Sequence, residues 1–171
     1  PVKNAVDGSF AGPADAFVTK FGPAGTNLIF STYIGGRFTV AGTFGDAIAL
    51  DSSNNVYITG YTDSSKFFPT TSGAYQTTLK GTSDAFVAKL NSAGSSLTYC
   101  TYLGGTNNEV ANGISVDSKG MVYITGGTSS PNFPMKNGLQ TTYGGSDDAF
   151  LTKLKPANTG TLDLLYSTFL G

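Results

Sequence analysis

Histidine and tryptophan are absent from this chain of 171 residues, and cysteine occurs once, at Cys100. Without histidine, neither a Ser-His-Asp nor a Cys-His catalytic arrangement can be assembled. A lone cysteine excludes an internal disulfide framework and a cysteine-cluster metal site. We therefore predict no catalytic residues, no metal site and no cofactor, and a protein that is not an enzyme.

Charge is scarce as well, since charged residues make up 12% of the chain, about half the usual share. The net charge is −1 and no basic cluster is present, so the sequence lacks the features of a nucleic-acid partner. No apolar run approaches the roughly 18 residues that a membrane span needs. Hydrophobic residues nevertheless reach 39%, enough to pack a core. This composition, rich in threonine and glycine, is typical of a secreted, extracellular or cell-surface protein.

Internal repetition is the main feature of the sequence. Three segments carry Asp-Ala-Phe-x-x-Lys or a close variant, three carry an aromatic-x-Thr-aromatic motif, and two carry Val-Tyr-Ile-Thr-Gly. These segments are residues 15–20, 84–89 and 148–153; 30–33, 99–102 and 166–169; and 56–60 and 122–126. Residues that recur at equivalent places are most simply explained by the architecture of the repeat. Cys100 falls where the other repeats have Ser31 and Ser167, so we interpret it as a small strand residue and not as a reactive thiol.

Each repeat predicts four short strands, bounded by clusters of Gly, Asn, Asp and Ser. In the central repeat these strands are residues 46–51, 56–59, 84–90 and 97–103, and the first two form a β-hairpin. No helical period is sustained, so we expect essentially no long helix. Both faces of the predicted strands carry apolar residues, which means that each antiparallel sheet needs covering on both sides. Radial stacking of four-stranded sheets, a β-propeller, meets that need.

Between residues 46 and 105 the chain reads Asp-Ala-Ile-Ala-Leu-Asp, Asn-Val-Tyr-Ile-Thr-Gly, Phe-Pro, Gly-Ala-Tyr-Gln and Asp-Ala-Phe-Val-Ala-Lys-Leu in turn. This series resembles the SBBP-type (seven-bladed) β-propeller repeat of bacterial and archaeal secreted and cell-surface proteins. The resemblance covers practically the whole chain. It implies an all-β fold of propeller blades, and it brings no catalytic motif, because the family is recognised by its blade sequence.

The chain opens in the middle of a repeat, because residues 1–12 align without a gap to residues 134–145. We predict about two and a half blades in one propeller-type domain. The C-terminal half of a blade occupies residues 1–36, and full blade repeats occupy residues 37–105 and 106–171. A propeller ring usually takes about four to eight blades. The sequence thus predicts a segment of a larger propeller or repeat array; the alternative is a short protein whose open sheet edges another subunit covers.

Two recurring polar motifs have structural interpretations. In the motif of Asp84 and Lys89, we expect the aspartate to end a loop through an Asx-type bond and the lysine to shield a sheet edge. The turns at residues 51–55 and 117–119 gather oxygen donors, but each offers a single carboxylate, whereas calcium usually takes several. A hairpin turn is the better account of both turns.

The connections at residues 61–83 and 127–147 are the best places for a binding site, because such long loops often bind ligands. Phe68 and Phe133 are equivalent to each other, so we interpret them as pins that hold the loop to the blade. Residues whose equivalents differ between repeats are better candidates for a distinct site. The candidates are Tyr61, Lys66, Phe67 and Asn132.

The sequence as a whole predicts a non-catalytic, extracellular or cell-surface β-propeller scaffold that mediates protein or glycan binding or adhesion. Its partners would be a protein or glycan ligand, or further copies or blades of the same protein. One alternative is a structural subunit of an extracellular filament or surface layer, assembled through blade edges. Another is a segment of a propeller enzyme, a lyase or hydrolase whose site lies in the central channel.

Overall fold

The computed structural model describes residues 1–36 and 42–171. In these residues ten β-strands form three antiparallel sheets, and the one helical element is a short 3-10 turn, η1 (Gly160–Asp163). The first sheet has two strands, β1 (Ala16–Phe21) and β2 (Leu28–Ile34). The second has β3 (Thr43–Leu50), β4 (Val56–Thr62), β5 (Asp84–Leu90) and β6 (Leu97–Leu103) in that order, and the third has β7 (Glu109–Val116), β8 (Val122–Thr128), β9 (Asp148–Leu154) and β10 (Leu164–Leu170).

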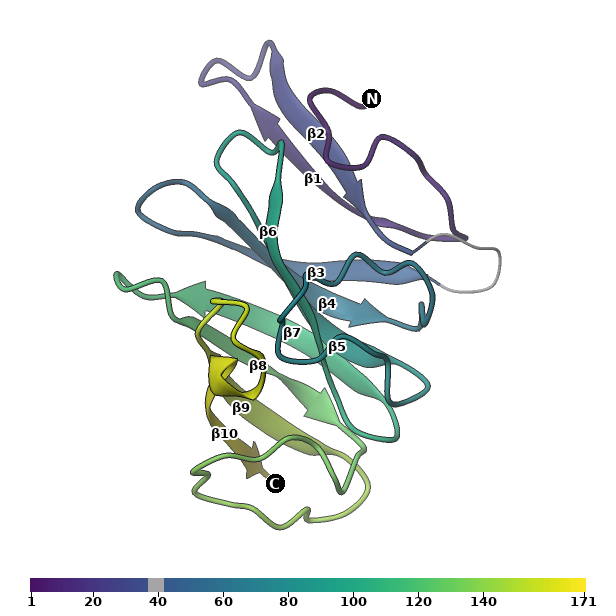
Figure 1. Ribbon diagram of the computed structural model, residues 1–171, viewed down its shortest axis with the longest axis vertical. Helices are drawn as coiled ribbons and strands as arrows, with labels where there is room; N and C mark the ends of the chain where they lie inside the picture. Colours follow the sequence, from purple (N-terminus) through teal and green to yellow (C-terminus); the bar gives the residue numbers. More distant parts are fainter. Residues whose placement is uncertain (37–41) are drawn as a thin grey trace.

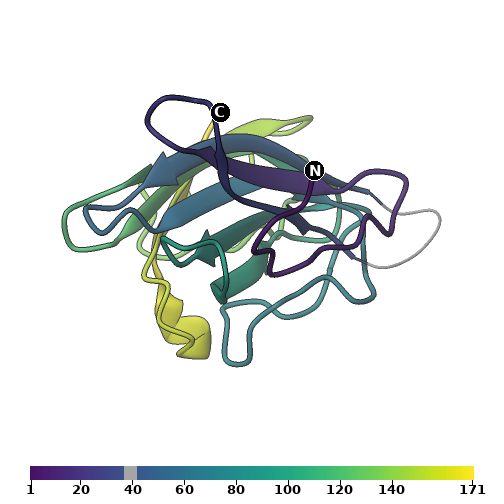
Figure 2. The same ribbon diagram turned by 90° about the horizontal axis from the view of Figure 1, so that it is seen from above.

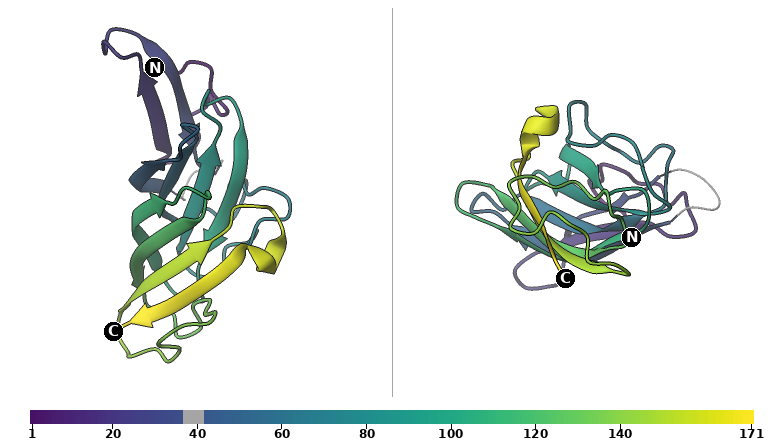
Figure 3. Two further views of the ribbon diagram at one scale, coloured as in Figure 1. Left: turned by 90° about the vertical axis from the view of Figure 1, so that its left-hand side faces the viewer. Right: turned by 90° about the horizontal axis from the view of Figure 1, so that it is seen from below.

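The sheets stack in chain order, as Figures 1 and 3 show, with the two termini at opposite ends of the stack. Each four-stranded sheet is a simple antiparallel meander. The first strands of the second and third sheets, β3 and β7, pack against each other. The β3–β4 and β7–β8 turns project on the same side, the left in Figures 1 and 2. This confirms the predicted all-β fold of propeller-blade sheets.

The two predicted hairpins form, but their strands are longer than the sequence indicated. β3 begins at Thr43, whose hydroxyl lies 2.9 Å from that of Thr62 at the far end of β4. β3 also contains a bulge between Gly45 and Ala47, and β7 has one at the equivalent place. The bulge brings the Phe44 carbonyl to where a Cβ of Gly60 would stand. The glycine that ends Val-Tyr-Ile-Thr-Gly is therefore required by the bulge on the neighbouring strand.

Two hydrophobic cores lie between the sheets. On β5, Phe86 and Leu90 belong to the core shared with the first sheet, whereas Ala85 and Val87 belong to the core shared with the third. All four side chains are fully buried. The expectation that both faces of a blade are covered therefore holds for the second sheet, and the alternation of side chains along a strand explains why its motif is apolar throughout.

A threonine in the last strand of each sheet fastens the preceding loop. In β6, the Thr101 hydroxyl accepts a hydrogen bond from the backbone NH of Gln76 (2.8 Å) and lies 3.1 Å from its carbonyl. The same arrangement joins Thr32 to Asp7 and Thr168 to Gln140. The predicted pins are confirmed as well, since Phe68 and Phe133 are buried and pack against aromatic rings of their own sheets.

The aspartate of the repeated Asp-Ala-Phe motif closes a loop, as predicted. The carboxylate of Asp84 accepts hydrogen bonds from the backbone NH groups of Lys80 and Gly81, both at 3.0 Å. The expectation for the lysine is wrong in the second and third sheets. Lys89 lies on β5, which pairs with a strand on each side, so it cannot shield a sheet edge. Its Nζ lies instead 5.0 Å from the centroid of the Tyr57 ring on β4, a cation–π contact across neighbouring strands.

Candidate functional site

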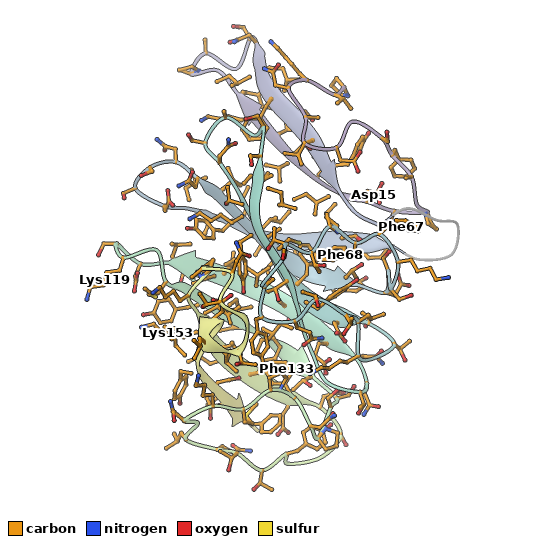
Figure 4. The ribbon with its side chains drawn as sticks, in the orientation of Figure 1. Asp15, Phe67, Phe68, Lys119, Phe133 and Lys153 are labelled. Atoms are coloured by element: carbon orange, nitrogen blue, oxygen red, sulfur yellow. The ribbon has the colours of Figure 1, made fainter. Side chains whose placement is uncertain are left out.

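Three of the predicted binding residues follow one another along the chain where β4 ends. Tyr61 of β4 stacks on Phe44 of β3, with ring centroids 4.8 Å apart and planes inclined by 16°. Lys66 and Phe67 follow in the next loop, and both side chains are exposed. Phe67 lies at the right-hand edge of the molecule in Figure 4 and adopts a φ of 61°, rare for a bulky residue. We call Phe44, Tyr61, Lys66 and Phe67 the β4-end surface.

The fourth predicted residue, Asn132, bridges two backbone segments through hydrogen bonds. Its side-chain oxygen accepts hydrogen bonds from the backbone NH and the hydroxyl of Thr106, both at 3.0 Å. Thr106 lies in the linker between β6 and β7, so Asn132 ties that linker to the loop that follows β8. Asn132 thus belongs to the third sheet and not to the β4-end surface, and a binding role for it stays a prediction.

A polar cluster at the β3–β4 turn surrounds Asp51. The carboxylate accepts hydrogen bonds from the backbone NH groups of Ser53 and Asn55, the Asn55 amide and the Tyr57 hydroxyl, at 2.8–3.1 Å. Lys89 Nζ is 3.9 Å away. Partial burial raises the pKa of Asp51, but hydrogen bonds from Asn55, Ser53 and Tyr57 outweigh burial and hold the pKa below its ordinary value. These hydrogen bonds close the β3–β4 turn, so the role of the cluster is structural.

The third sheet repeats this cluster at Asp117, which accepts hydrogen bonds from the backbone NH groups of Lys119 (2.8 Å) and Met121 (2.9 Å) and from the Tyr123 hydroxyl (3.2 Å). Lys153 Nζ lies 4.8 Å from the centroid of the Tyr123 ring. Lys119 and Lys153 mark this end of the sheet at the left of Figure 4. The hairpin interpretation therefore accounts for the polar residues of both turns.

Two carboxylates are buried near the linker between the second and third sheets. Asp84 also accepts a hydrogen bond from the Gln76 amide (2.6 Å), and Glu109 accepts hydrogen bonds from the Gly105 backbone NH (2.8 Å) and the Thr128 hydroxyl (2.6 Å). Burial is the main cause that raises the pKa of Asp84, and the Glu109 carboxylate raises it further, against the hydrogen bonds that lower it. Groups of neighbouring loops and strands donate hydrogen bonds to each carboxylate, so we interpret the role of the pair as structural.

A groove runs between β1 and β3, and sequence reasoning missed it. It contains cavities of about 440, 310 and 180 Å³. The largest is mostly apolar and lies among Val18, Phe30, Leu50 and Val56. The signal that could have found the groove was the surplus half-repeat at the N-terminal end, which leaves β1 with fewer partners than β5 or β9 have.

Residues 1–36 and 42–171 hold neither a cluster of potential metal ligands nor an exposed thiol. No group of three or more His, Cys, Asp or Glu side chains in these ranges could hold a metal ion. Cys100 is buried, and burial raises the pKa of its thiol well above the ordinary value. The same ranges include no helix with the length and apolarity to cross a bilayer.

The fold and its contacts define a class of protein built from β-propeller blades. Two segments, residues 29–68 and 98–134, match the family described as the SBBP beta-propeller repeat, so the chain contains repeats of this family, as its motifs indicated. Each matched segment begins at or within the last strand of one sheet and ends after the second strand of the next sheet. None of the curated proteins matches the chain.

Proposed function

We propose that the protein is a non-catalytic scaffold, secreted or held at the cell surface, which binds a protein or glycan through the β4-end surface. The observation that carries the proposal is the stacked pair of Phe44 and Tyr61, with Phe44 41% exposed; Lys66 and Phe67, which are also exposed, follow in the loop after β4. Aromatic rings supply large contact areas at low entropic cost, and binding residues concentrate on loops that a rigid scaffold positions.

The repeats favour this surface over the rest of the blade. Phe44 and Tyr61 are replaced by Val110 and Gly127 in the third sheet, although both pairs lie opposite each other in the same register. An aromatic pair that only supported the blade would be expected in both sheets. The buried carboxylates and turn clusters, in contrast, are committed to hydrogen bonds within the chain, which supports a scaffold without catalysis.

A binding array tests this proposal. Fluorescently labelled protein would be applied to arrays of purified glycans and of purified extracellular matrix proteins. We expect a bound class whose signal falls at least about tenfold in Tyr61→Ala and Lys66→Ala, which corresponds to about 1.4 kcal/mol. Leu139→Ala is the matched control, because Leu139 is an exposed residue on the equivalent loop of the third sheet. Equal binding by all variants, or no binding to either array, would refute the proposed surface.

A second candidate is a subunit of an extracellular filament or layer, which the exposed apolar residues of β1 favour. Phe17 and Phe21 are both largely exposed on a strand with one partner in the described chain. Such strands associate with other chains unless they are protected. Sedimentation velocity over a range of concentrations, followed by electron microscopy, would reveal ordered polymers if assembly is the function, and a monomer at all concentrations would exclude it.

A further inference from the structure

The strand that carries Asp-Ala-Phe lies between two partners in both four-stranded sheets. β5 pairs with β4 and β6, and β9 pairs with β8 and β10. β1 carries the same motif, yet its one partner strand among the described residues is β2. The other edge of β1 faces the groove in which the three cavities lie. An unpaired edge presents backbone donors and acceptors to an extended segment of suitable sequence.

The side chains of β1 have the composition of a covered strand. Phe17 is 67% exposed and Phe21 is 59% exposed, whereas the equivalent Phe86 and Leu90 of β5 are completely buried. Phe86 and Leu90 lie in the core between the first and second sheets, so the exposure of Phe17 and Phe21 marks an uncovered face of the first sheet, whereas Val18 on the other face of β1 is buried in that core. β1 thus has the apolar residues of a strand from within a stack, yet one of its edges lacks a partner strand among the described residues.

The largest cavity shows which side chain that strand would bring. Its lining includes Val18, Lys20, Ile48, Leu50 and Val56. The equivalent residues between the second and third sheets are Val87, Lys89, Ile114, Val116 and Val122. Around these residues the space is filled by Tyr57 of β4, which is fully buried in the cluster of Val87 and Val122 and carries Lys89 Nζ 5.0 Å from its ring centroid.

We propose that the edge of β1 and the adjoining cavity take a β-hairpin of a further SBBP repeat, whose second strand reads Val-Tyr-Ile-Thr-Gly. The register follows from the complete sheets, where Val56 lies opposite Leu90, Tyr57 opposite Lys89 and Gly60 opposite Phe86. By equivalence the incoming valine lies opposite Phe21, the tyrosine opposite Lys20 and the glycine opposite Phe17. The tyrosine ring fills the cavity beneath the Lys20 ammonium group, a cation–π contact.

A second copy of this chain is a poor source for the hairpin. Its own Val-Tyr-Ile-Thr-Gly strands are β4 and β8, and each is already paired on both edges within its sheet. A copy could offer such a strand only by opening that sheet and losing its core. The occupant is therefore a hairpin of another repeat, and it binds by continuing the strand pairing that β4 makes with β5.

The experiment adds that hairpin in its natural spacing. Residue 1 aligns with residue 134, so a copy of residues 109–133 placed directly before Pro1 needs no linker. In hydrogen exchange, we expect the amides of β1 to exchange at least about tenfold more slowly than in the original chain. We also expect a higher Tm than for a chain extended by the same residues in scrambled order.

Two variants separate specific docking from general stabilisation. Alanine in place of the tyrosine copied from Tyr123 should abolish most of the rise in Tm, because the cavity then stays empty. Ile48→Glu should also abolish most of the rise in Tm of the extended chain. In the original chain the same substitution should shift the Tm by no more than about 2 °C, because Ile48 is 60% exposed there.

Three results would overturn the inference. The added residues could exchange as an unstructured tail, with a Tm equal to that of the scrambled extension. The Tm of the tyrosine variant could equal that of the extended chain, which would show that filling the cavity contributes nothing to docking. The original chain could also dimerise on concentration and protect its own β1 amides, in which case a second copy is the occupant.

Discussion

One cross-strand pair explains why a cysteine replaces a serine in the central repeat. Two of the three sheets place a threonine opposite a serine at this position, with the two hydroxyl oxygens 2.9 Å apart. In the second sheet both hydroxyls are absent together, because alanine faces cysteine. The pairs are Thr19–Ser31, Thr152–Ser167 and Ala88–Cys100. A buried hydroxyl needs a partner, and the repeat supplies either both members of the pair or neither.

This pairing predicts non-additive mutations. Cys100→Ser alone should destabilise the protein by about 1–3 kcal/mol, because it buries a hydroxyl opposite Ala88. Adding Ala88→Thr should recover about 1 kcal/mol relative to the sum of the two single changes. Urea unfolding of the two single variants and the double variant measures this coupling. A coupling energy near zero would show that the hydroxyl pair contributes nothing.

The buried acids predict a pH-dependent effect of Glu109→Gln. The pKa of Asp84 is raised in the folded protein, first by burial and then by Glu109, so the stability linked to it is complete below the ordinary value of 3.8 and falls as pH rises through the folded pKa. Removing the Glu109 charge should reduce that loss. We expect the variant to melt about 2–4 °C higher at pH 7, which corresponds to roughly 1 kcal/mol, with the advantage disappearing well below pH 3.8.

The geometry allows this substitution. The glutamine can accept from the Gly105 NH and donate to the Thr128 hydroxyl, so both present contacts keep a partner. Asp147→Asn is the matched control, because it removes the same charge from an exposed position. Calorimetry across the pH range measures the Tm of both variants. A rise in the Tm of Glu109→Gln that is equally large at acidic and neutral pH would contradict the role given to Asp84.

Among the elements, the hairpins and the four-strand order were predictable from the sequence because they repeat. Val-Tyr-Ile-Thr-Gly and Asp-Ala-Phe fix which strands pair, and the turn residues fix where the chain reverses. The β9–β10 loop was not predictable in the same way, because it spans residues 155–163, whereas the β5–β6 loop spans residues 91–96. Repetition carries no information about an insertion present in one copy.

That longer loop fastens the third sheet to the second. Asn158 accepts a hydrogen bond from the Thr71 hydroxyl (2.6 Å) and donates one to the Thr98 carbonyl (3.1 Å). Asn158 has a φ of 57°, so Asn158→Gly removes both contacts without backbone strain. We expect a loss of about 1–2 kcal/mol in urea unfolding, with faster amide exchange in residues 155–163.

A second asparagine provides the control for this prediction. Asn54 has a φ of 59° in the β3–β4 turn, so Asn54→Gly makes the same change to the unfolded chain without removing a contact between sheets. The difference between the two variants isolates the contribution of the bridge. Equal losses would mean that the backbone alone accounts for the effect of Asn158→Gly.

The candidate site was only partly predictable from the sequence. Comparison of repeats pointed to Tyr61, Lys66 and Phe67, because their equivalents differ, but the stacking partner Phe44 emerges only when β3 and β4 pair. Asn132 also differs between repeats, yet its contacts with Thr106 are structural. A sequence difference shows where two blades diverge, and only the packing shows whether the divergent residue faces the solvent or a neighbouring loop.

Across the whole molecule, burial depends on the neighbouring sheets more than on the motif. Leu103 and Leu170 occupy equivalent positions, but Leu103 is completely buried by the third sheet and Leu170 is 50% exposed. The first sheet shows the same contrast on its opposite face. Stability in such a stack is set by contacts between nearest neighbours, so the same residue has different energetic weight at the ends and in the centre.

Two phenylalanines in the same motif position test this principle. Phe86 is completely buried and packs at 5.4 Å against the ring of Phe68, so Phe86→Ala should cost about 3–5 kcal/mol. Phe17→Ala should cost less than about 1 kcal/mol, because the Phe17 side chain is 67% exposed. Urea unfolding compares the two directly, and similar losses would contradict the nearest-neighbour account.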